Sequence, residues 1–217
     1  MENKSIIDKK DIYYNREKTR IISYFPEGKH VVLDLGCATG QLGHGLKNAG
    51  KAAEIIGVEI FDPAAEEAAK HYDRVYTIDI ETVDLPYKEY FDFVVCGDIL
   101  EHLKNPWEMA HKIYGWLKND GTLLASIPNI RYWRIIRDLV FRGKWEYVDS
   151  GILDNTHLRF FTRTDFLLLL KKANFATARH DMVVNGVKQN LFNKITLSLF
   201  EEFLGSQIII EAKKNLI

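Results

Sequence analysis

Cysteine is scarce in this chain of 217 residues, which contains only Cys37 and Cys96. Their spacing matches no metal-ligand motif and cannot build a disulfide framework, so we expect no metal centre and a reducing compartment. No apolar run approaches the roughly 20 residues of a membrane-spanning helix, and the first residues do not resemble a signal peptide. These absences predict a cytoplasmic protein without a transmembrane segment.

The chain also lacks an excess of either charge, because 29 Lys and Arg residues stand against 30 Asp and Glu residues. A formal net charge of -1 gives no overall attraction to nucleic acid or to anionic membranes. With 47% hydrophobic and 27% charged residues, the composition is that of an ordinary globular protein. We expect a single domain over residues 1–217, interrupted by an insertion over residues 130–161.

Strand and helix patterns alternate through the first two thirds of the chain. Short apolar runs predict buried strands, and the cap-plus-proline pairs Asp62-Pro63 and Asn105-Pro106 predict helix starts. The predicted strands cover residues 31–35, 54–60, 74–80, 91–97 and 122–127, and the helices between them cover residues 41–49, 62–71 and 106–118. Such alternation favours a parallel sheet covered by helices, with ligands bound beyond the carboxyl ends of the strands.

The last third has a different pattern. Thr162 to Asp165 resembles a capping box that opens a helix. Alternating and apolar segments then predict helix 166–173, strand 176–184, helix 191–204 and strand 207–211. Seven strands are therefore predicted in all.

The strongest local signal is the segment Leu33-Asp-Leu-Gly-Cys-Ala-Thr-Gly, in which an acidic strand residue is followed by spaced glycines. Glycine allows a sharp turn and lets a ligand lie against the backbone without a Cβ clash. The segment resembles the first motif of class I S-adenosylmethionine-dependent methyltransferases, with Asp34, Gly36 and Gly40 at the matching positions. Ala38 replaces the middle glycine of that motif.

Four later segments also resemble this family, and the resemblance covers residues 12 to 128 well. They lie at Glu59, at Asp79-Ile80-Glu81, at residues 91–103 and at residues 123–129. The family implies a doubly wound, Rossmann-like α/β sheet of seven strands, mostly parallel with an antiparallel last strand, plus a small helical and aromatic cap. It also implies S-adenosylmethionine as cofactor and S-adenosylhomocysteine as product.

The resemblance further implies which residues hold the cofactor. Asp34 would act on the methionine half, and Asp79 would accept from the adenine amine. Glu59 ends a strand, where a carboxylate can accept hydrogen bonds from both ribose hydroxyls. The predicted cofactor set is Asp34, Gly36, Cys37, Ala38, Gly40, Glu59, Ile60, Asp79, Ile80 and Gly97.

A dinucleotide-binding protein is the competing hypothesis, because its fingerprint also places glycines after a strand. Here Ala38 and Gln41 depart from that fingerprint. An NAD-dependent sugar-modifying enzyme would use a constellation such as Tyr-x-x-x-Lys. Tyr14 and Lys18 have that spacing, but they precede the glycine loop instead of following it.

Two histidines are candidates for a catalytic base. A hydroxyl acceptor is a poor nucleophile and gains from a general base, and imidazole has a suitable pKa near neutrality. His102 follows the fourth predicted strand, and His157 lies where the insertion rejoins the core. We predict that one of them takes the proton and that Asp98 orients it or binds the acceptor.

The insertion is basic and aromatic. Seven Lys and Arg residues stand against four acids between Asn129 and Arg163, with Tyr, Trp and Phe interleaved. Arginine forks suit phosphates, and aromatic faces suit sugar rings. The alternative is an amphipathic helix with Trp133, Ile136 and Val140 on the core.

A closer resemblance bears on the acceptor. Tyr13-Tyr14, Ile127 to Arg131 and His157 to Thr162 resemble methyltransferases of bacterial surface-glycan clusters, which are often linked to glycosyltransferases. This resemblance implies a sugar or glycan hydroxyl on a nucleotide-sugar or lipid-linked saccharide. The predicted substrate-binding set is Tyr14, Arg131, Tyr132 and Arg159.

Other acceptors and partners stay open. A quinone-like molecule or an amine would need the same core motifs, and a homodimer or association with a glycosyltransferase is compatible with the sequence. A binding subunit without catalysis is disfavoured by the intact loop between Gly36 and Gly40. Nucleic-acid methylation is disfavoured because Cys96-Gly-Asp-Ile replaces the Asn/Asp-Pro-Pro-Tyr/Phe-type motif after the fourth strand.

Overall fold

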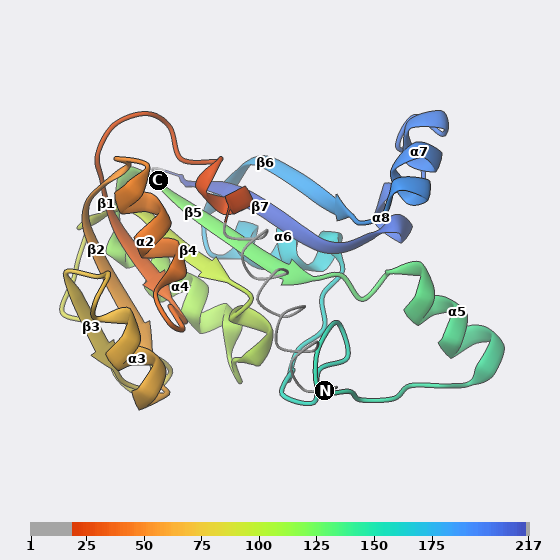
Figure 1. The fold of residues 1–217 in the computed structure, drawn as a ribbon, viewed down its shortest axis with the longest axis horizontal. Helices are drawn as coiled ribbons and strands as arrows, with labels where there is room; N and C mark the ends of the chain where they lie inside the picture. Colours follow the sequence, from red (N-terminus) through yellow and green to blue (C-terminus); the bar gives the residue numbers. More distant parts are fainter. Residues whose placement is uncertain (1–18, 216–217) are drawn as a thin grey trace, which may run out of the picture.

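A computed structural model describes residues 19–215 as a seven-stranded sheet flanked by helices (Figure 1). The strand order is β3-β2-β1-β4-β5-β7-β6. All neighbours pair in parallel except at β7, which is antiparallel to both β5 and β6. The strands are β1 (His30–Leu35), β2 (Ala52–Glu59), β3 (Arg74–Thr77), β4 (Phe91–Gly97), β5 (Leu117–Pro128), β6 (Phe175–Val184) and β7 (Gly205–Lys214). The predicted doubly wound sheet with one antiparallel strand is confirmed.

Helices cover both faces of the sheet. On one face, α2 (Gln41–Asn48) and α3 (Asp62–Ala68) pack with residues 21–25. On the other, α4 (Pro106–Trp116) and α6 (Arg163–Lys172) complete the larger core. The remaining helices are η1 (Leu100–His102), α5 (Trp133–Arg142), α7 (Val187–Ile195) and α8 (Glu201–Leu204). No helix within residues 19–215 is long and apolar enough to cross a bilayer.

Successive residues of the central strands serve opposite faces. In β1, Val32 packs in the core beneath α2, whereas Leu33 and Leu35 pack in the core beneath α4 and α6. The strand is therefore buried on both sides, as a continuous apolar run predicts. Cys37 and Cys96 are both buried.

The two cap signals have different outcomes. Asn105 caps α4, where its side chain accepts a hydrogen bond from the Glu108 amide. Asp62, expected as a cap, instead lies in the first turn of α3, and Phe61 precedes the helix without a side-chain cap. An acid in the first turn still favours the helix through its interaction with the helix dipole.

The predicted helix over residues 191–204 is wrong in its continuity. The chain forms α7 and then α8, and between them Leu197 and Ser198 have φ angles of 49° and 61°. Two consecutive left-handed residues end a right-handed helix, although the helical hydrophobic pattern runs through the break. The third strand is also shorter than predicted, because it ends at Thr77.

The insertion contains α5, but the predicted apolar contact with the core does not form. None of the residues of α5 is buried, and Val140 is 64% exposed. The helix projects from the end of β5 away from α2 and α3 (Figure 1). Its apolar side chains are therefore available to something other than the core of this chain.

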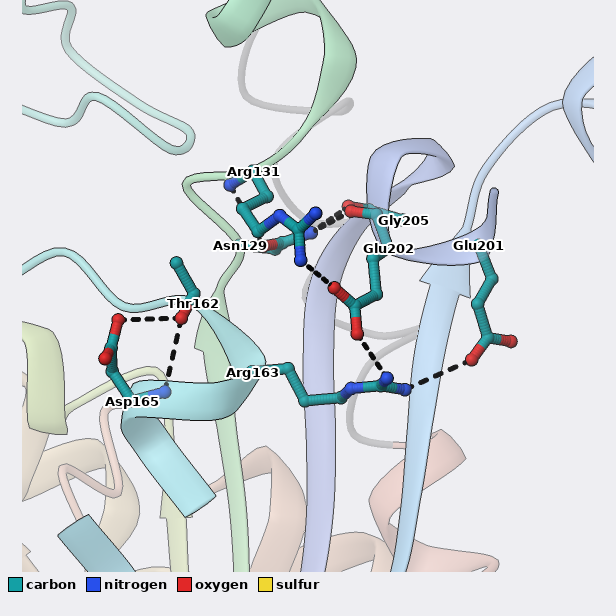
Figure 2. Close-up of polar contacts among 8 residues, drawn as sticks. All are labelled: Asn129, Arg131, Thr162, Arg163, Asp165, Glu201, Glu202 and Gly205. Carbon is teal, nitrogen blue, oxygen red and sulfur yellow. Dashed lines mark hydrogen bonds and ion pairs between the residues drawn. The ribbon is translucent and has the colours of Figure 1, made fainter. Parts of the chain in front are cut away.

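A polar network joins the start of the insertion to α8 (Figure 2). The amide of the buried Asn129 side chain donates to the carbonyl oxygens of Glu202 and Gly205, at 2.7 and 2.8 Å. Glu202 pairs with both Arg131 and Arg163, and Glu201 pairs with Arg163. These contacts fix α8 against the ends of β5 and β7 and turn both glutamates inward.

Candidate active site

The loop between β1 and α2 has three left-handed residues in five positions. The φ angles are 70° at Gly36, 46° at Ala38 and 83° at Gly40. A Cβ on Gly40 would lie 2.8 Å from the Cα of Ala68, so only glycine fits between the loop and α3. Ala38 occupies the position of the middle glycine in the family's motif. Its backbone is left-handed, a conformation that usually favours glycine, but the loop accommodates its methyl group.

Glu59 connects the end of β2 to this loop. Its carboxylate accepts from the Ala38 amide at 2.9 Å and from the amides of Ile60 and Phe61 at 2.9 and 3.0 Å. Ile60 is 67% exposed beside it and offers an apolar surface for a ring. Asp79 accepts from the Glu81 amide at 2.9 Å, and Ile80 is buried. The carboxyl ends of β1, β2 and β3 thus bring the predicted cofactor residues to one edge.

Asp34 is buried in β1 and held by Tyr72, a residue that the sequence analysis did not identify. The Tyr72 hydroxyl donates to the Asp34 carboxylate at 2.5 Å and accepts from the Gly43 amide at 3.1 Å. Burial, and then the Asp34 charge, raise the pKa of Tyr72 well above 10. The hydroxyl therefore stays protonated and fixes the carboxylate under the glycine loop.

We predict that Tyr72→Phe lowers the free energy of unfolding by roughly 1–3 kcal/mol, because it leaves a buried carboxylate and a buried amide without this partner. Chemical denaturation measures the change. Tyr90→Phe is the matched control, since Tyr90 donates to Glu54 at the exposed surface and should have little effect. Equal effects of the two variants would contradict the role assigned to Tyr72.

A cavity of about 970 Å³ begins at the glycine loop and extends under the insertion. Asp34, Gly36, Ala38 and Gly97 line its inner end. Its outer end is lined by residues from α5 and from the segment 144–157. The space is large enough for a small acceptor beside the glycine loop, whereas Glu59 and Asp79 are not among its lining residues.

Asp98 lines this cavity in a strained conformation, with a φ angle of 53°. Its carboxylate accepts from the Ser126 hydroxyl at 3.1 Å and from the Gln207 amide nitrogen at 2.9 Å to each oxygen. Its backbone amide donates to the Ser126 carbonyl at 3.1 Å. Side chains from β5 and β7 therefore hold Asp98 in place, although neither was identified from the sequence.

The two predicted histidines lie against each other beside Asp98 in the cavity lining. The ring centroids of His102 and His157 are 4.7 Å apart in an edge-to-face arrangement. Burial, and then the neighbouring His157, lower the pKa of His102 below 6.5, so its ring is neutral near pH 7. Glu101, which the sequence analysis did not single out, is only 1% exposed, and its Oε1 lies 4.0 Å from Nε2 of His157.

Hydrogen bonds fix how each imidazole faces the cavity. Nδ1 of His157 lies 3.0 Å from the Ile152 carbonyl, which can only accept, so Nδ1 carries a proton. Nδ1 of His102 lies 3.3 Å from the Thr156 carbonyl and 3.1 Å from the Thr156 hydroxyl, which itself donates to Asp154. Nδ1 of His102 therefore also donates, and because this ring is neutral near pH 7 its Nε2 can accept a proton. The backbone amides of Leu158 and Arg159 donate to the Glu101 carbonyl at 2.9 Å and join the insertion to η1.

The same three side chains could also hold a metal ion. Ligand atoms of Glu101, His102 and His157 all lie within 4.8 Å of one another. Two imidazoles and a carboxylate suit divalent transition metals. The cluster of Glu101, His102 and His157 is therefore compatible with either a proton acceptor or a cation site.

The predicted substrate residues are only partly brought together. Tyr132 lines the cavity. Arg131 is instead paired with Glu202 and lies over the Phe203 ring, and Arg159 donates to the Lys104 carbonyl and lies over Trp107. Neither arginine is in the cavity lining, where Arg134 and Lys144 are the basic residues. Tyr14 lies outside the described residues.

A model of the methyltransferase domain matches residues 9–180, which is most of the chain. The chain belongs to the methyltransferase-domain family. The expected methyltransferase domain is thus confirmed by the family model, and the expected class I fold by the sheet.

Known proteins agree with this assignment. The chain is 31% identical over 108 residues to the ubiquinone biosynthesis O-methyltransferase of Actinobacillus pleuropneumoniae serotype 5b (strain L20), covering 45% of each chain. The aligned part of this chain thus spans about half the length of that curated relative. Similar structures are S-adenosylmethionine-dependent methyltransferases of Archaeoglobus fulgidus (TM-score 0.69, 19% identity, 93% of each chain) and Thermotoga maritima (TM-score 0.66, 21% identity, 96% of each chain).

Proposed function

We propose that this methyltransferase transfers the methyl group of S-adenosylmethionine to a hydroxyl oxygen of a small acceptor. The observation that carries the proposal is the pair of imidazoles in the cavity lining, His102 and His157, with Oε1 of the buried Glu101 4.0 Å from Nε2 of His157. A hydroxyl oxygen that attacks in line with the sulfur–methyl bond loses its proton, and a nearby imidazole would accept that proton.

The cofactor fits the glycine loop and the carboxyl ends of β1 to β3. Glu59 would accept from the ribose hydroxyls, with Ile60 against the ring and Asp79 near the adenine amine. The backbone of Gly36, Cys37, Ala38, Gly40, Ile80 and Gly97, together with Asp34, would complete the site. When bound, the sulfonium supplies an electrophilic methyl group, and its sulfur leaves with the electron pair as S-adenosylhomocysteine.

His157 would take the proton that the acceptor hydroxyl loses as the new O–CH₃ bond forms. The carboxylate of Glu101 favours the resulting imidazolium across 4.0 Å of buried space. Asp98, held by Ser126 and Gln207, would bind a second polar group of the acceptor. The neutral His102 packs on His157 and would limit its rotation, or accept the proton in its place.

A sugar or glycan hydroxyl is the acceptor that the cavity favours. Its outer end has Tyr132 for ring contact and Arg134 and Lys144 for a phosphate. Those groups suit a nucleotide-sugar or a lipid-linked saccharide. A glycosyltransferase would be the natural partner of such an enzyme.

A phenolic quinone precursor is the second candidate acceptor. It is favoured by the name of the relatives, ubiquinone biosynthesis O-methyltransferase. A phenol is more acidic than a sugar hydroxyl, so it would depend less on His157. A methyl-transfer assay with nucleotide-sugars, lipid-linked saccharides and quinols as acceptors separates the two, and turnover of an amine alone would overturn O-methylation.

Removal of metal ions tests how the histidine cluster works. If His157 acts as the proton acceptor, dialysis against EDTA should leave kcat unchanged, because no cation takes part. Activity is measured before dialysis, after it, and after addition of Mg²⁺, Mn²⁺ or Zn²⁺. Loss of activity on dialysis and its return with one cation would instead assign Glu101, His102 and His157 to a metal site.

A further inference from the structure

Exposed apolar side chains gather on two neighbouring parts of the molecule. Within residues 19–215, eleven of the twenty exposed large apolar side chains lie in α5 or between residues 187 and 203. We call these eleven residues the outer patch: Leu139, Val140, Phe141, Val187, Leu191, Phe192, Ile195, Leu197, Leu199, Phe200 and Phe203. A soluble chain rarely leaves so many large apolar groups in one region without a binding role.

The two parts of the outer patch are held at the same end of the sheet. Pro128 of β5 pairs with Gln207 of β7, so α5 leaves the sheet where α8 enters it. The Asn129 contacts with Glu202 and Gly205 fix this junction (Figure 2). Both α5 and α7 project beyond it (Figure 1).

Helix α7 is amphipathic with its apolar side facing outward. Val187, Leu191 and Ile195 recur at every fourth position and therefore share one face of the helix, where they are 87%, 58% and 71% exposed. No residue of α7 is buried. The helix α7 is thus exposed on the surface and does not pack into the core.

Among the described residues, the charges around the outer patch that have no partner of opposite sign are basic. No acid occurs between residues 187 and 200, and Lys188 and Lys194 lie on α7. In the described part of the chain, no carboxylate pairs with either lysine or with Arg134 of α5, whereas Asp138 is neutralised by Arg137 and Arg142.

Both glutamates of this segment are paired with arginines. Glu201 pairs with Arg163, and Glu202 pairs with Arg131 and Arg163 (Figure 2). The outward surface therefore combines apolar side chains with lysine and arginine, which is the composition of a helix that lies in an anionic membrane interface.

We propose that the outer patch docks on the surface of a bilayer that contains anionic lipid, with α7 lying in the interface. Arg134 and Ile135 of α5 line the cavity that holds the acceptor, so docking brings the cavity mouth to the membrane. The acceptor would then be a lipid-anchored molecule whose reactive hydroxyl enters the cavity from the membrane side. This part of the inference rests on the proposed function.

A second copy of the chain is a less suitable occupant. In a twofold interface the same patch meets itself, so Lys188 and Lys194 of one copy would approach those of the other. Like charges brought together oppose such an interface, whereas anionic headgroups would neutralise them.

Vesicle flotation of the full chain tests the proposal without any turnover. We expect binding to vesicles of phosphatidylcholine with phosphatidylglycerol, weaker binding to phosphatidylcholine alone, and weakening with salt. Leu191→Glu combined with Ile195→Glu should abolish binding. Lys188→Gln combined with Lys194→Gln should weaken it roughly 25-fold, from about a 5-fold loss for each charge.

Leu168→Glu is the matched control, because Leu168 is 48% exposed on α6 outside the outer patch. All variants must bind S-adenosylhomocysteine as the wild type does, which shows that they are folded. Absence of vesicle binding by the wild type, or equal binding by Leu191→Glu/Ile195→Glu, would overturn the proposal. A dimer that this variant breaks would assign the patch to a second copy. Because no acceptor is used, these outcomes are independent of the proposed reaction.

Discussion

His157→Ala should lower kcat for methyl transfer by roughly 10²- to 10⁴-fold, the range typical for loss of a general base. The expectation follows from the place of His157 in the cavity lining, where the Ile152 carbonyl holds its Nδ1 and Oε1 of Glu101 lies 4.0 Å from its Nε2. The affinity for S-adenosylhomocysteine should not change, because His157 lies outside the glycine loop and the ends of β1 to β3. Single-turnover rates and calorimetry measure the two quantities.

The controls for this prediction come from the chain itself. His44 and His71 form a second histidine pair with ring centroids also 4.7 Å apart, but neither lines the cavity. His44→Ala should therefore leave kcat unchanged. Full turnover by both His157→Ala and His102→Ala at saturating acceptor would eliminate the histidine pair as the proton acceptor.

Gly40→Ala should destabilise the protein and weaken S-adenosylhomocysteine binding at least about tenfold. A left-handed residue other than glycine costs roughly 1–2 kcal/mol, and overpacking adds about 1–3 kcal/mol. At Gly40 both apply, because its φ angle is 83° and the new Cβ would lie 2.8 Å from the Ala68 backbone. Any shift of the loop that relieves the clash also moves the Ala38 amide away from Glu59.

Gly50→Ala separates strain from steric exclusion. Gly50 has a φ angle of 69°, but a Cβ there would meet nothing within 4 Å. This variant should lose only the strain, about 1–2 kcal/mol, and should bind the cofactor normally. Equal cofactor affinities for Gly40→Ala and Gly50→Ala would show that the loop does not form the cofactor site. Chemical denaturation and calorimetry give both readouts.

Local patterns were sufficient to predict the sheet. Apolar runs such as Val31 to Leu35 are buried on both faces, and the glycine loop follows the strand as expected. The helix between residues 191 and 204 shows where such patterns fail. Nothing in the residues Leu197 and Ser198 marks the left-handed break, which is held by contacts of α8 with Asn129, Arg131 and Arg163.

The site was predictable where it follows the ends of strands. Asp34, Glu59, Asp79 and Asp98 each lie at or just after a strand, and parallel strands bring those ends together. Partners distant in sequence were not predictable. Tyr72 reaches Asp34 across 38 positions, and Gln207 reaches Asp98 across 109, because the sheet places their strands and helices side by side.

Arg131 illustrates how a charged residue can mislead. Its place in a basic, aromatic segment favoured a substrate role, but it pairs with Glu202, which lies 71 positions away. Glu101 is the opposite case. It stands next to His102 in the sequence, and only its burial beside His157 reveals that it lies in the histidine cluster.

A crystal structure of the protein with S-adenosylhomocysteine tests the central claim most directly. The nucleoside should lie on the loop between Gly36 and Gly40, with its ribose hydroxyls on Glu59 and its sulfur toward the cavity that contains Asp98 and His157. A nucleoside bound elsewhere, or a filled glycine loop whose sulfur points away from that cavity, would contradict the account.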